Sequence, residues 1–197
     1  HDLDFSKPEA LVIEEYLTCG LTGKTNKSGA KGKDERWANF WFGEGKASKK
    51  GGELGRAGEG KITYNMASRA NSLISISTRD GEKYGHLFGK CVFPSTYEVN
   101  GIEYGRNCYW CLNDKSNPEQ PIPTSDNETL EKFKNAYCLE RDLDQPGTSW
   151  VIPFPQISLS KEILIKALLK DFFFTIYSSK AEIEICGEKI TQSNLIV

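Results

Sequence analysis

The sequence predicts one α/β domain over residues 1–197, a two-layer sandwich in which a mixed, mostly antiparallel sheet packs on helices. Three observations predict this class. The dipeptides Asp80-Gly81 and Asn100-Gly101 are hairpin turn signals between extended segments. The run "ALVIEEY" (10–16) is apolar and partly β-branched, and a helix with a wide apolar face follows Ser160. The 197 residues are enough to bury a substantial core.

The first third of the chain predicts one strand and two helices separated by glycine-rich loops. The strand is the buried run 10–16. Residues 22–36 are polar, glycine-rich and without periodicity, so we expect a mobile loop, and a second glycine-lysine loop covers 43–60. A short helix between the loops is predicted by three aromatic residues at helical spacing: Trp37, Phe40 and Trp41. Another helix should run from Lys61 to about Ala70.

The middle of the chain predicts hairpins and a surface loop. Two strands should flank Asp80-Gly81, with His86 as a pairing residue, and two more extended segments should flank Asn100-Gly101. Residues 113–128 are rich in Asn, Pro, Ser and Asp, which is typical of a surface loop.

The C-terminal part predicts two helical stretches and further strands. The segment "ETLEKFKNAYCL" (128–139) is amphipathic, and "GTSWVIPFP" (147–155) reads as a strand bounded by prolines. A helix should begin at a Ser160 cap, and the alternating residues 181–190 should pair around Gly187.

Charge and composition exclude several classes of protein. The net charge is −2, from 25 basic and 27 acidic residues, so no global field favours nucleic acid or an anionic membrane, although lysines cluster between residues 24 and 61. No apolar run is long enough to span a bilayer and the N-terminus does not resemble a signal peptide, so we expect a cytoplasmic protein without membrane contact.

The six cysteines are scattered, and we expect free thiols in such a compartment. Cys108 and Cys111 form "CYWC", half of a zinc knuckle, but a second CxxC or a His pair is missing because the chain has only 2 histidines. The sequence also lacks a Ser-His-Asp signature and an HExxH motif. Ordinary thiols therefore remain the better interpretation, and no other familiar enzyme chemistry is indicated.

The segment "GRAGEGK" (55–61) has the physical features of a phosphate site. Its glycines let backbone amides approach an oxyanion, and the helix that follows points its positive end at that anion, while Arg56 or Lys61 can add charge. The spacing fits neither the dinucleotide fingerprint nor the P-loop. A flexible surface loop is the alternative that the spacing alone leaves open.

Three stretches in order, "VIEEYLTCGLTG", "GELGRAGEGK" and "GTSWVIP", resemble the GHKL ATPases, the superfamily of gyrase, the large heat-shock chaperone, histidine kinases and MutL. More closely, the chain is similar to a bacterial group of ATP-binding proteins whose strand-loop reads like "IEDFGTxGLTG" and whose lid reads like "GRWGIGK". The resemblance covers most of residues 10–180. It implies a Bergerat-like fold that binds ATP, with Mg²⁺ as a companion ion.

The resemblance also implies site residues. The family's strand-loop presents an acid to the adenine amino group, a role that falls to Glu15, with Thr18 and Gly20 beside the nucleotide. A carboxylate accepts a hydrogen bond from the exocyclic amine of adenine but not from the carbonyl of guanine. Glu15 replaces the usual Asp, and Leu17 stands where glycine is normal and would crowd the base. Thr148 is implied as the strand threonine that reaches the acid and a water, and its alternative is a plain β-branched strand residue.

The ATP lid is implied within the loops of residues 22–60. Its end corresponds to "GRAGEGK", where Gly55, Gly58, Gly60 and Lys61 close over the phosphates. The segment "EGKASKK" resembles the serine-lysine element of some members, which assigns Ser48 and Lys49 to the same site.

Hydrolysis in this superfamily needs a helix before the strand-loop, with a Glu that activates water and an Asn that holds magnesium. Only "HDLDFSKPE" stands upstream here, and Pro8 breaks it further. We therefore expect this chain to bind ATP as a conformational switch, with a protein partner or a second copy, and to hydrolyse it poorly.

Two functions of other classes remain open. The same sandwich could serve as a protein-interaction module without nucleotide. Nucleic-acid binding through the lysine-rich loops, with Trp37, Trp41 and Phe42 as stacking residues, ranks last, because tryptophans at helical spacing are more easily explained as core.

Overall fold

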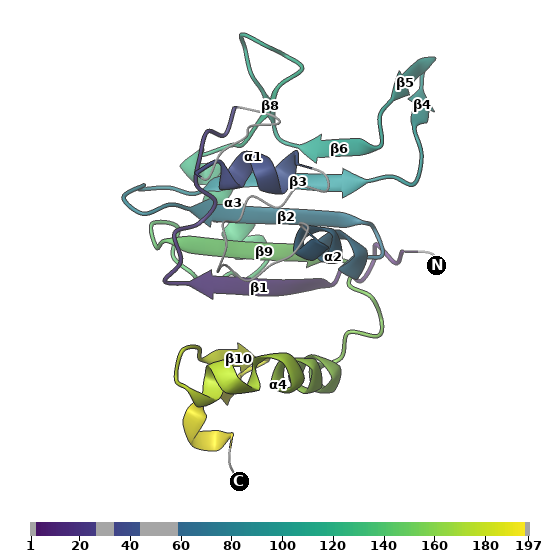
Figure 1. Ribbon diagram of the computed structural model, residues 1–197. Coiled ribbons are helices and arrows are strands. Elements are labelled where there is room, and N and C mark those ends of the chain that lie inside the picture. Colours follow the sequence, from purple (N-terminus) through teal and green to yellow (C-terminus); the bar gives the residue numbers. More distant parts are fainter. Residues whose placement is uncertain (1–2, 27–33, 44–58, 196–197) are drawn as a thin grey trace. The chain divides into compact units, whose positions relative to one another are not determined.

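The computed structural model describes residues 3–26, 34–43 and 59–195, and divides them into two compact units, His1–Pro155 and Gln156–Val197. The first unit is built on a five-stranded sheet with the order β1-β9-β2-β3-β6 (Figure 1). The strands are β1 (Ala10–Tyr16), β9 (Gly147–Pro153), β2 (Ser72–Thr78), β3 (His86–Val92) and β6 (Asn107–Trp110). All neighbouring pairs are antiparallel, so an α/β protein with a mostly antiparallel sheet is confirmed.

The strand β9, between the edge strand β1 and β2, joins the first and last parts of this unit. It pairs with β1 on one side and β2 on the other, and six of its seven residues are buried. Trp150 and Ile152 face one side of the sheet and Val151 faces the other, so both faces carry apolar side chains. The register places Glu15 of β1 opposite Thr148, and Thr148 opposite Ser77 of β2.

Helices cover both faces of the sheet. On one face lie α1 (Arg36–Trp41) and α2 (Glu59–Ala67), with Trp37 and Trp41 fully buried against Leu73 and Phe88. On the other lies α3 (Asn127–Ala136), whose Leu130 packs on Ile76 and Val151. Figure 1 shows α1 and α2 in front of the sheet and α3 behind it. The two-layer expectation is therefore wrong in this detail, because the amphipathic pattern of 128–139 does not tell which face the helix covers.

Short hairpins extend from the sheet at the positions the turn residues predict. Asn100 and Gly101 both have positive φ, 52° and 78°, and connect β4 (Tyr97–Val99) to β5 (Ile102–Tyr104). The expected surface loop at 113–128 instead contains a small pairing of β7 (Leu112–Asn113) with β8 (Pro121–Ile122). All six cysteines are free, as expected.

The second unit is a helix with a hairpin. Its helix α4 (Lys161–Tyr177) begins where predicted, because the Ser160 side chain accepts a hydrogen bond from the backbone N–H of Ile163. The hairpin pairs β10 (Ile183–Ile185) with β11 (Glu188–Ile190) and turns at Cys186 and Gly187, and a 3-10 turn, η1 (Gln192–Asn194), follows it.

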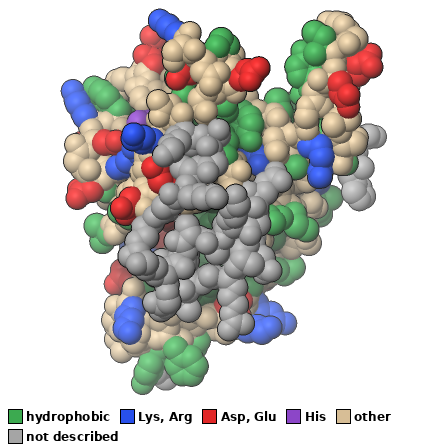
Figure 2. All heavy atoms as spheres, turned by 45° about the horizontal axis from the view of Figure 1, so that its top comes forward, with side chains coloured by type: hydrophobic (Ala, Val, Ile, Leu, Met, Phe, Trp, Pro, Cys, Tyr) green, Lys and Arg blue, Asp and Glu red, His purple; other side chains and the backbone are tan. Residues whose placement is uncertain are grey.

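Charged side chains are interspersed on the surface. Figure 2 shows Lys, Arg, Asp and Glu side chains side by side over the coloured part of the visible face, in keeping with the near-zero net charge. Among the described residues, no helix combines the length and apolar character that crossing a bilayer requires.

Candidate functional site

Two neighbouring carboxylates of β1 point to opposite faces of the sheet. Glu15 lies on the face of α1 and α2, where its Oε1 accepts a hydrogen bond from the indole N–H of Trp150 at 3.0 Å. That bond uses one acceptor position of a carboxylate that has about four. Glu15 is half-buried and retains acceptor capacity toward a ligand on this face.

Two hydroxyl groups lie beside Glu15, on the same face of the sheet. Thr148 lies directly opposite Glu15, and its Oγ1 is 3.0 Å from the Oγ of Ser77 on the next strand. Both side chains are buried. Register therefore gathers a carboxylate and two hydroxyls from three strands into one row.

The loop after β1 is held against that row by a backbone hydrogen bond. The Ser77 Oγ accepts a hydrogen bond from the backbone N–H of Leu21 at 2.8 Å. Gly20 has φ +63°, and a Cβ at this position would collide with the carbonyl oxygen of Thr78. Glycine at position 20 is thus required by the close approach of two backbones, independently of any ligand.

Leu17 and Thr18 differ from what the resemblance implies for this loop. Leu17 has φ +58°, a conformation that favours glycine, and its side chain is 94% exposed. The backbone at this leucine therefore has the left-handed geometry that glycine adopts most easily, while the leucine side chain extends into solvent. Thr18 is also exposed.

The helix α2 lies on the same side of the sheet and packs on Trp150, next to the row. Its Tyr64 ring stacks on Trp150, with centroids 5.1 Å apart and an angle of 15° between the planes. Burial, and to a smaller extent the charge of Glu15, raises the pKa of Tyr64, so this phenol stays a neutral donor at physiological pH. Gly60 and Lys61 belong to the first turn of α2. The other predicted lid residues, Ser48, Lys49, Gly55 and Gly58, lie outside the described residues.

Unsatisfied polar atoms remain on this face. The Ser75 Oγ and the indole nitrogens of Trp37 and Trp41 are buried, and none of them has a hydrogen-bond partner among the residues that the structure describes. Buried polar atoms are usually paired in folded proteins, so each such atom calls for a water, a ligand or another segment of chain.

The opposite face carries a closed network that the sequence did not reveal. The Glu14 carboxylate accepts hydrogen bonds from the backbone N–H of Glu140 (2.8 Å), the backbone N–H of Arg141 and the Ser149 hydroxyl (2.7 Å). The buried Arg141 guanidinium donates to Ser149, to Thr78 and to the carbonyls of Ile76, Asp142 and Gln145. In the sequence these residues are one acid in "VIEEY" and one arginine in a polar stretch. The only sequence signal is the strand assignment of "VIEEY", because successive residues of a strand point to opposite faces and the two acids must therefore lie on different faces.

The described residues offer little to a metal ion. They contain no cluster of three or more His, Cys, Asp or Glu side chains that could hold one. Mg²⁺ therefore stays a prediction of the resemblance, without ligands in the described part of the chain.

Comparisons with known proteins add no assignment. The chain matches no protein-family model, no curated protein and no solved structure. The row formed by Glu15, Thr148 and Ser77, beside the Trp150 ring on which Tyr64 of α2 stacks, is therefore the basis on which a function can be argued.

Proposed function

We propose that the first unit binds an adenine nucleotide on the face of α1 and α2, and that nucleotide binding rather than rapid hydrolysis is its role. The observation that carries the proposal is the register of β1 and β9. It sets the Glu15 carboxylate opposite the Thr148 hydroxyl, on the face that α2 covers.

Adenine recognition follows from the chemistry of this row. The free acceptor positions of Glu15 suit the exocyclic amine of adenine, whereas guanine would present a carbonyl oxygen to the same carboxylate. The hydroxyls of Thr148 and Ser77 can hold a water between the sheet and the base, because each hydroxyl both donates and accepts.

The phosphates belong at the other end of the ligand, near the start of α2. Backbone N–H groups in the first turn of a helix are unpaired and attract an anion. Lys61 belongs to that turn by its backbone, and the resemblance implies a lysine charge at this position. Binding would then act as a switch that couples the strand-loop at Gly20 to α2 and to a protein partner.

The proposal is tested by thermal denaturation with ATP and with GTP. A ligand at 100 times its Kd stabilises a protein by about 2.7 kcal/mol, which corresponds to roughly 5–10 °C for a chain of this size. We expect ATP to raise the Tm and GTP to leave it unchanged. An unshifted Tm of the intact protein at millimolar ATP with Mg²⁺ would contradict the proposal.

Variants separate recognition from folding. Glu15→Ala should lose the ATP-dependent shift, and Thr148→Val, which removes one hydroxyl at nearly constant volume, should reduce it. The matched control is Glu98→Ala, because Glu98 is an exposed carboxylate on β4, away from the row, and should keep the full shift. Retention of the shift by Glu15→Ala would remove the assigned role of that carboxylate.

The second candidate is a protein-interaction module, and α4 is the observation that favours it. This helix leaves large apolar side chains in solvent, with Phe174 81% exposed, Phe172 52% and Ile163 51%. Exposed apolar groups of this size are typical of binding surfaces. A folded protein with no response to ATP, whose sedimentation coefficient rises with concentration, would favour this candidate over nucleotide binding.

A further inference from the structure

A serine, a histidine and a glutamate meet at the start of β3. The bridge between Leu87 and Thr124, in which each backbone N–H donates to the carbonyl of the other residue at 2.9 and 3.1 Å, places Ser125 opposite His86. Next to such a doubly bonded pair comes a pair without backbone hydrogen bonds, whose side chains lie closest across the strands. The Ser125 Oγ is accordingly 2.7 Å from the His86 Nδ1.

A carboxylate lies at the other nitrogen of the imidazole ring. The Oε2 of Glu82 is 3.1 Å from the His86 Nε2, although the two atoms are not aligned for a hydrogen bond. Arg79 steadies this glutamate, since its Nη1 is 3.4 Å from the Glu82 Oε1 and its Nε donates to the Leu21 carbonyl at 2.8 Å. The negative charge beside Nε2 favours a proton on that nitrogen, so Nδ1 is the acceptor for the serine hydroxyl.

The histidine is shielded from solvent, whereas the serine is open to it. The Trp37 ring packs edge-on against the imidazole, with centroids 5.8 Å apart. Burial lowers the pKa of His86 and outweighs the attraction of Glu82, so the ring is neutral at physiological pH and can accept a proton. Ser125 is exposed, so a substrate can reach its hydroxyl directly.

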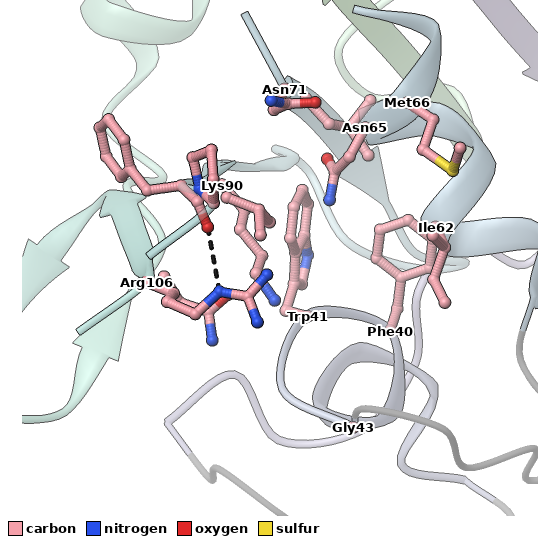
Figure 3. A pocket seen from close by; sticks show the side chains of 14 residues that line it. Phe40, Trp41, Gly43, Ile62, Asn65, Met66, Asn71, Lys90 and Arg106 are labelled. Carbon is pink, nitrogen blue, oxygen red and sulfur yellow. Dashed lines mark hydrogen bonds between the residues drawn. The ribbon is translucent and has the colours of Figure 1, made fainter. Parts of the chain in front are cut away.

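The cluster lies apart from the Glu15 carboxylate and from the cavity of the same unit. His86 is opposite Ser77 in the register, three strand spacings from Glu15, which is about 14 Å. Figure 3 shows the cavity, of about 430 Å³, which Lys90 lines from further along β3. None of the three residues of the cluster lines it.

The start of α3 supplies hydrogen-bond donors and negative charge beside Ser125. The backbone N–H groups of Asn127 and Glu128, in the first turn, have no partner within the helix. Such groups stabilise the oxyanion that forms when a nucleophile adds to a carbonyl. The carboxylates of Asp126 and Glu128 belong to the same turn and would repel an anionic substrate.

We infer that Ser125 is a nucleophile that His86 activates, and that this site hydrolyses small uncharged carboxylic esters. The His86 Nδ1 takes the hydroxyl proton as the Ser125 Oγ bonds to the ester carbonyl carbon, and it passes that proton to the alcohol oxygen as the ester bond breaks. Water then adds to the acyl-serine, giving its proton to Nδ1. The bond between the acyl group and Oγ breaks, Oγ regains a proton from Nδ1, and the acid leaves. Glu82 is a positioning residue.

The test follows hydrolysis of p-nitrophenyl acetate by the intact chain. Ser125→Ala should lower the rate by about tenfold or more. The six free thiols can also attack an activated ester, but this variant keeps all of them, so the difference between the two rates belongs to Ser125. Peptide mass spectrometry of the acid-quenched wild type should find the acetyl group on Ser125. Equal rates in the two proteins would overturn the inference.

Two further variants separate catalysis from folding. Ser116→Ala is the matched control, because this exposed serine bonds to Asp114 at 2.6 Å instead of to a histidine, and it should react like the wild type. His86→Gln should lose as much activity as Ser125→Ala, and the double variant should lose no more, since the two groups act in one step. Thermal denaturation checks each fold. Losses that multiply in the double variant would contradict the shared step.

Glu82→Gln tests the positioning role through pH. Besides burial, the charged groups that act on His86 among the described residues are Glu82, which raises its pKa, and Arg79, which lowers it. The rate should rise with pH as His86 loses its proton, and removal of the Glu82 charge should move that rise to lower pH. A lower rate at every pH, with the profile unmoved, would show a merely structural role.

The substrate class and the independence from nucleotide have their own measurements. The anionic ester mono-p-nitrophenyl succinate should react more slowly than the acetate, and equal rates would refute the preference for uncharged esters. Glu15→Ala should keep the full esterase rate, and Ser125→Ala should keep the full ATP-dependent shift in Tm. Loss of the esterase rate in a folded Glu15→Ala would place the reaction in the nucleotide site and refute the assignment to Ser125.

Discussion

The two faces of the central sheet treat adjacent glutamates in opposite ways. Glu14 faces the side of α3, where its carboxylate accepts hydrogen bonds from two backbone N–H groups and two hydroxyls. Beside it lies a buried arginine whose own donors reach five acceptors. Glu15 faces the side of α1 and α2, where the Trp150 indole is its hydrogen-bond donor among the described residues. The same residue type, one position apart, is therefore fully used on one face and partly available on the other.

This difference distinguishes polar side chains that hold the fold together from polar side chains that are available to bind a ligand. A buried network in which each group has a partner stabilises one conformation, and removing any member leaves its partners unpaired. A face that keeps an accessible carboxylate, paired hydroxyls and unsatisfied buried atoms has not completed its hydrogen bonding within the described residues. Function is therefore better sought at Glu15 than at Glu14, although Glu14 has more contacts.

The largest expected effect on stability comes from the buried Glu14–Arg141 network, on the α3 face of the sheet. Arg141→Met should lower the free energy of unfolding by about 3–5 kcal/mol, because it leaves buried carbonyls and hydroxyls without a donor. Urea denaturation measures the change. Arg106→Met is the matched control, since Arg106 is exposed, and should stay within about 0.5 kcal/mol of the wild type. A loss below 1 kcal/mol for Arg141→Met would show that the network contributes little.

Gly20 tests whether the loop beside the row is as tightly constrained as its geometry indicates. Gly20→Ala should lower the free energy of unfolding by roughly 2–3 kcal/mol, from the strain of positive φ and the collision with Thr78. Gly101→Ala is the control, because Gly101 also has positive φ, 78°, but has no atom within 4 Å of an added Cβ. Its cost should be only about 1 kcal/mol. Equal losses in urea denaturation would mean that the approach to Thr78 is looser than described.

A pair of serines compares the faces directly. Ser149→Ala removes hydrogen bonds to the charged Glu14 and Arg141 and should cost roughly 2 kcal/mol. Ser75→Ala removes a buried hydroxyl that has no partner among the described residues, so its stability should change by less than about 0.5 kcal/mol. Calorimetric melts of the two variants give both values. A clear loss of stability for Ser75→Ala would reveal a hydrogen-bond partner of Ser75, such as a bound water or ligand, on the face of α1 and α2.

The smallest effect concerns pH and His86. Burial lowers the pKa of His86, and this outweighs the attraction of Glu82, whose Oε2 is 3.1 Å from Nε2. The unfolded chain then binds more protons than the folded one just below about pH 6.5. The contribution of His86 to stability is complete above that pH and is lost as pH falls through the folded pKa. The Tm should therefore fall between pH 7.5 and 5.5, and less so in His86→Gln. Identical pH profiles for the two proteins would contradict this.

Local signals made most of the fold predictable from sequence. The Asp-Gly and Asn-Gly turns specify their hairpins within a few residues, and the Ser160 cap sets the start of α4. The strand at residues 10–16 was predicted with its exact bounds, but the expectation that it is buried is wrong, because β1 is an edge strand in which no residue is fully buried. Trp37 and Trp41 are core residues, as expected. The β7–β8 pairing was missed, because two-residue strands carry no periodicity.

The sequence could identify candidate site residues only where they belong to a recognisable motif. The sequence suggested Glu15 and Thr148 through a resemblance, and the register sets them opposite each other, but their role in nucleotide binding stays a prediction. Trp150, Ser77 and the Glu14–Arg141 network depend on which strands become neighbours. That information is non-local, since β9 comes from the end of the unit and inserts between β1 and β2.

The position of β9 between β1 and β2 also has a consequence for how the first unit folds during synthesis. Until residues 147–153 have left the ribosome, the partner edges of β1 and β2 lack their common neighbour. Nascent chains of intermediate length would thus present open hydrogen-bonding edges, which favour aggregation. The strands β2, β3 and β6 pair with one another without β9, so a fragment that ends before Gly147 keeps those pairings available but leaves β1 without its neighbour in the sheet.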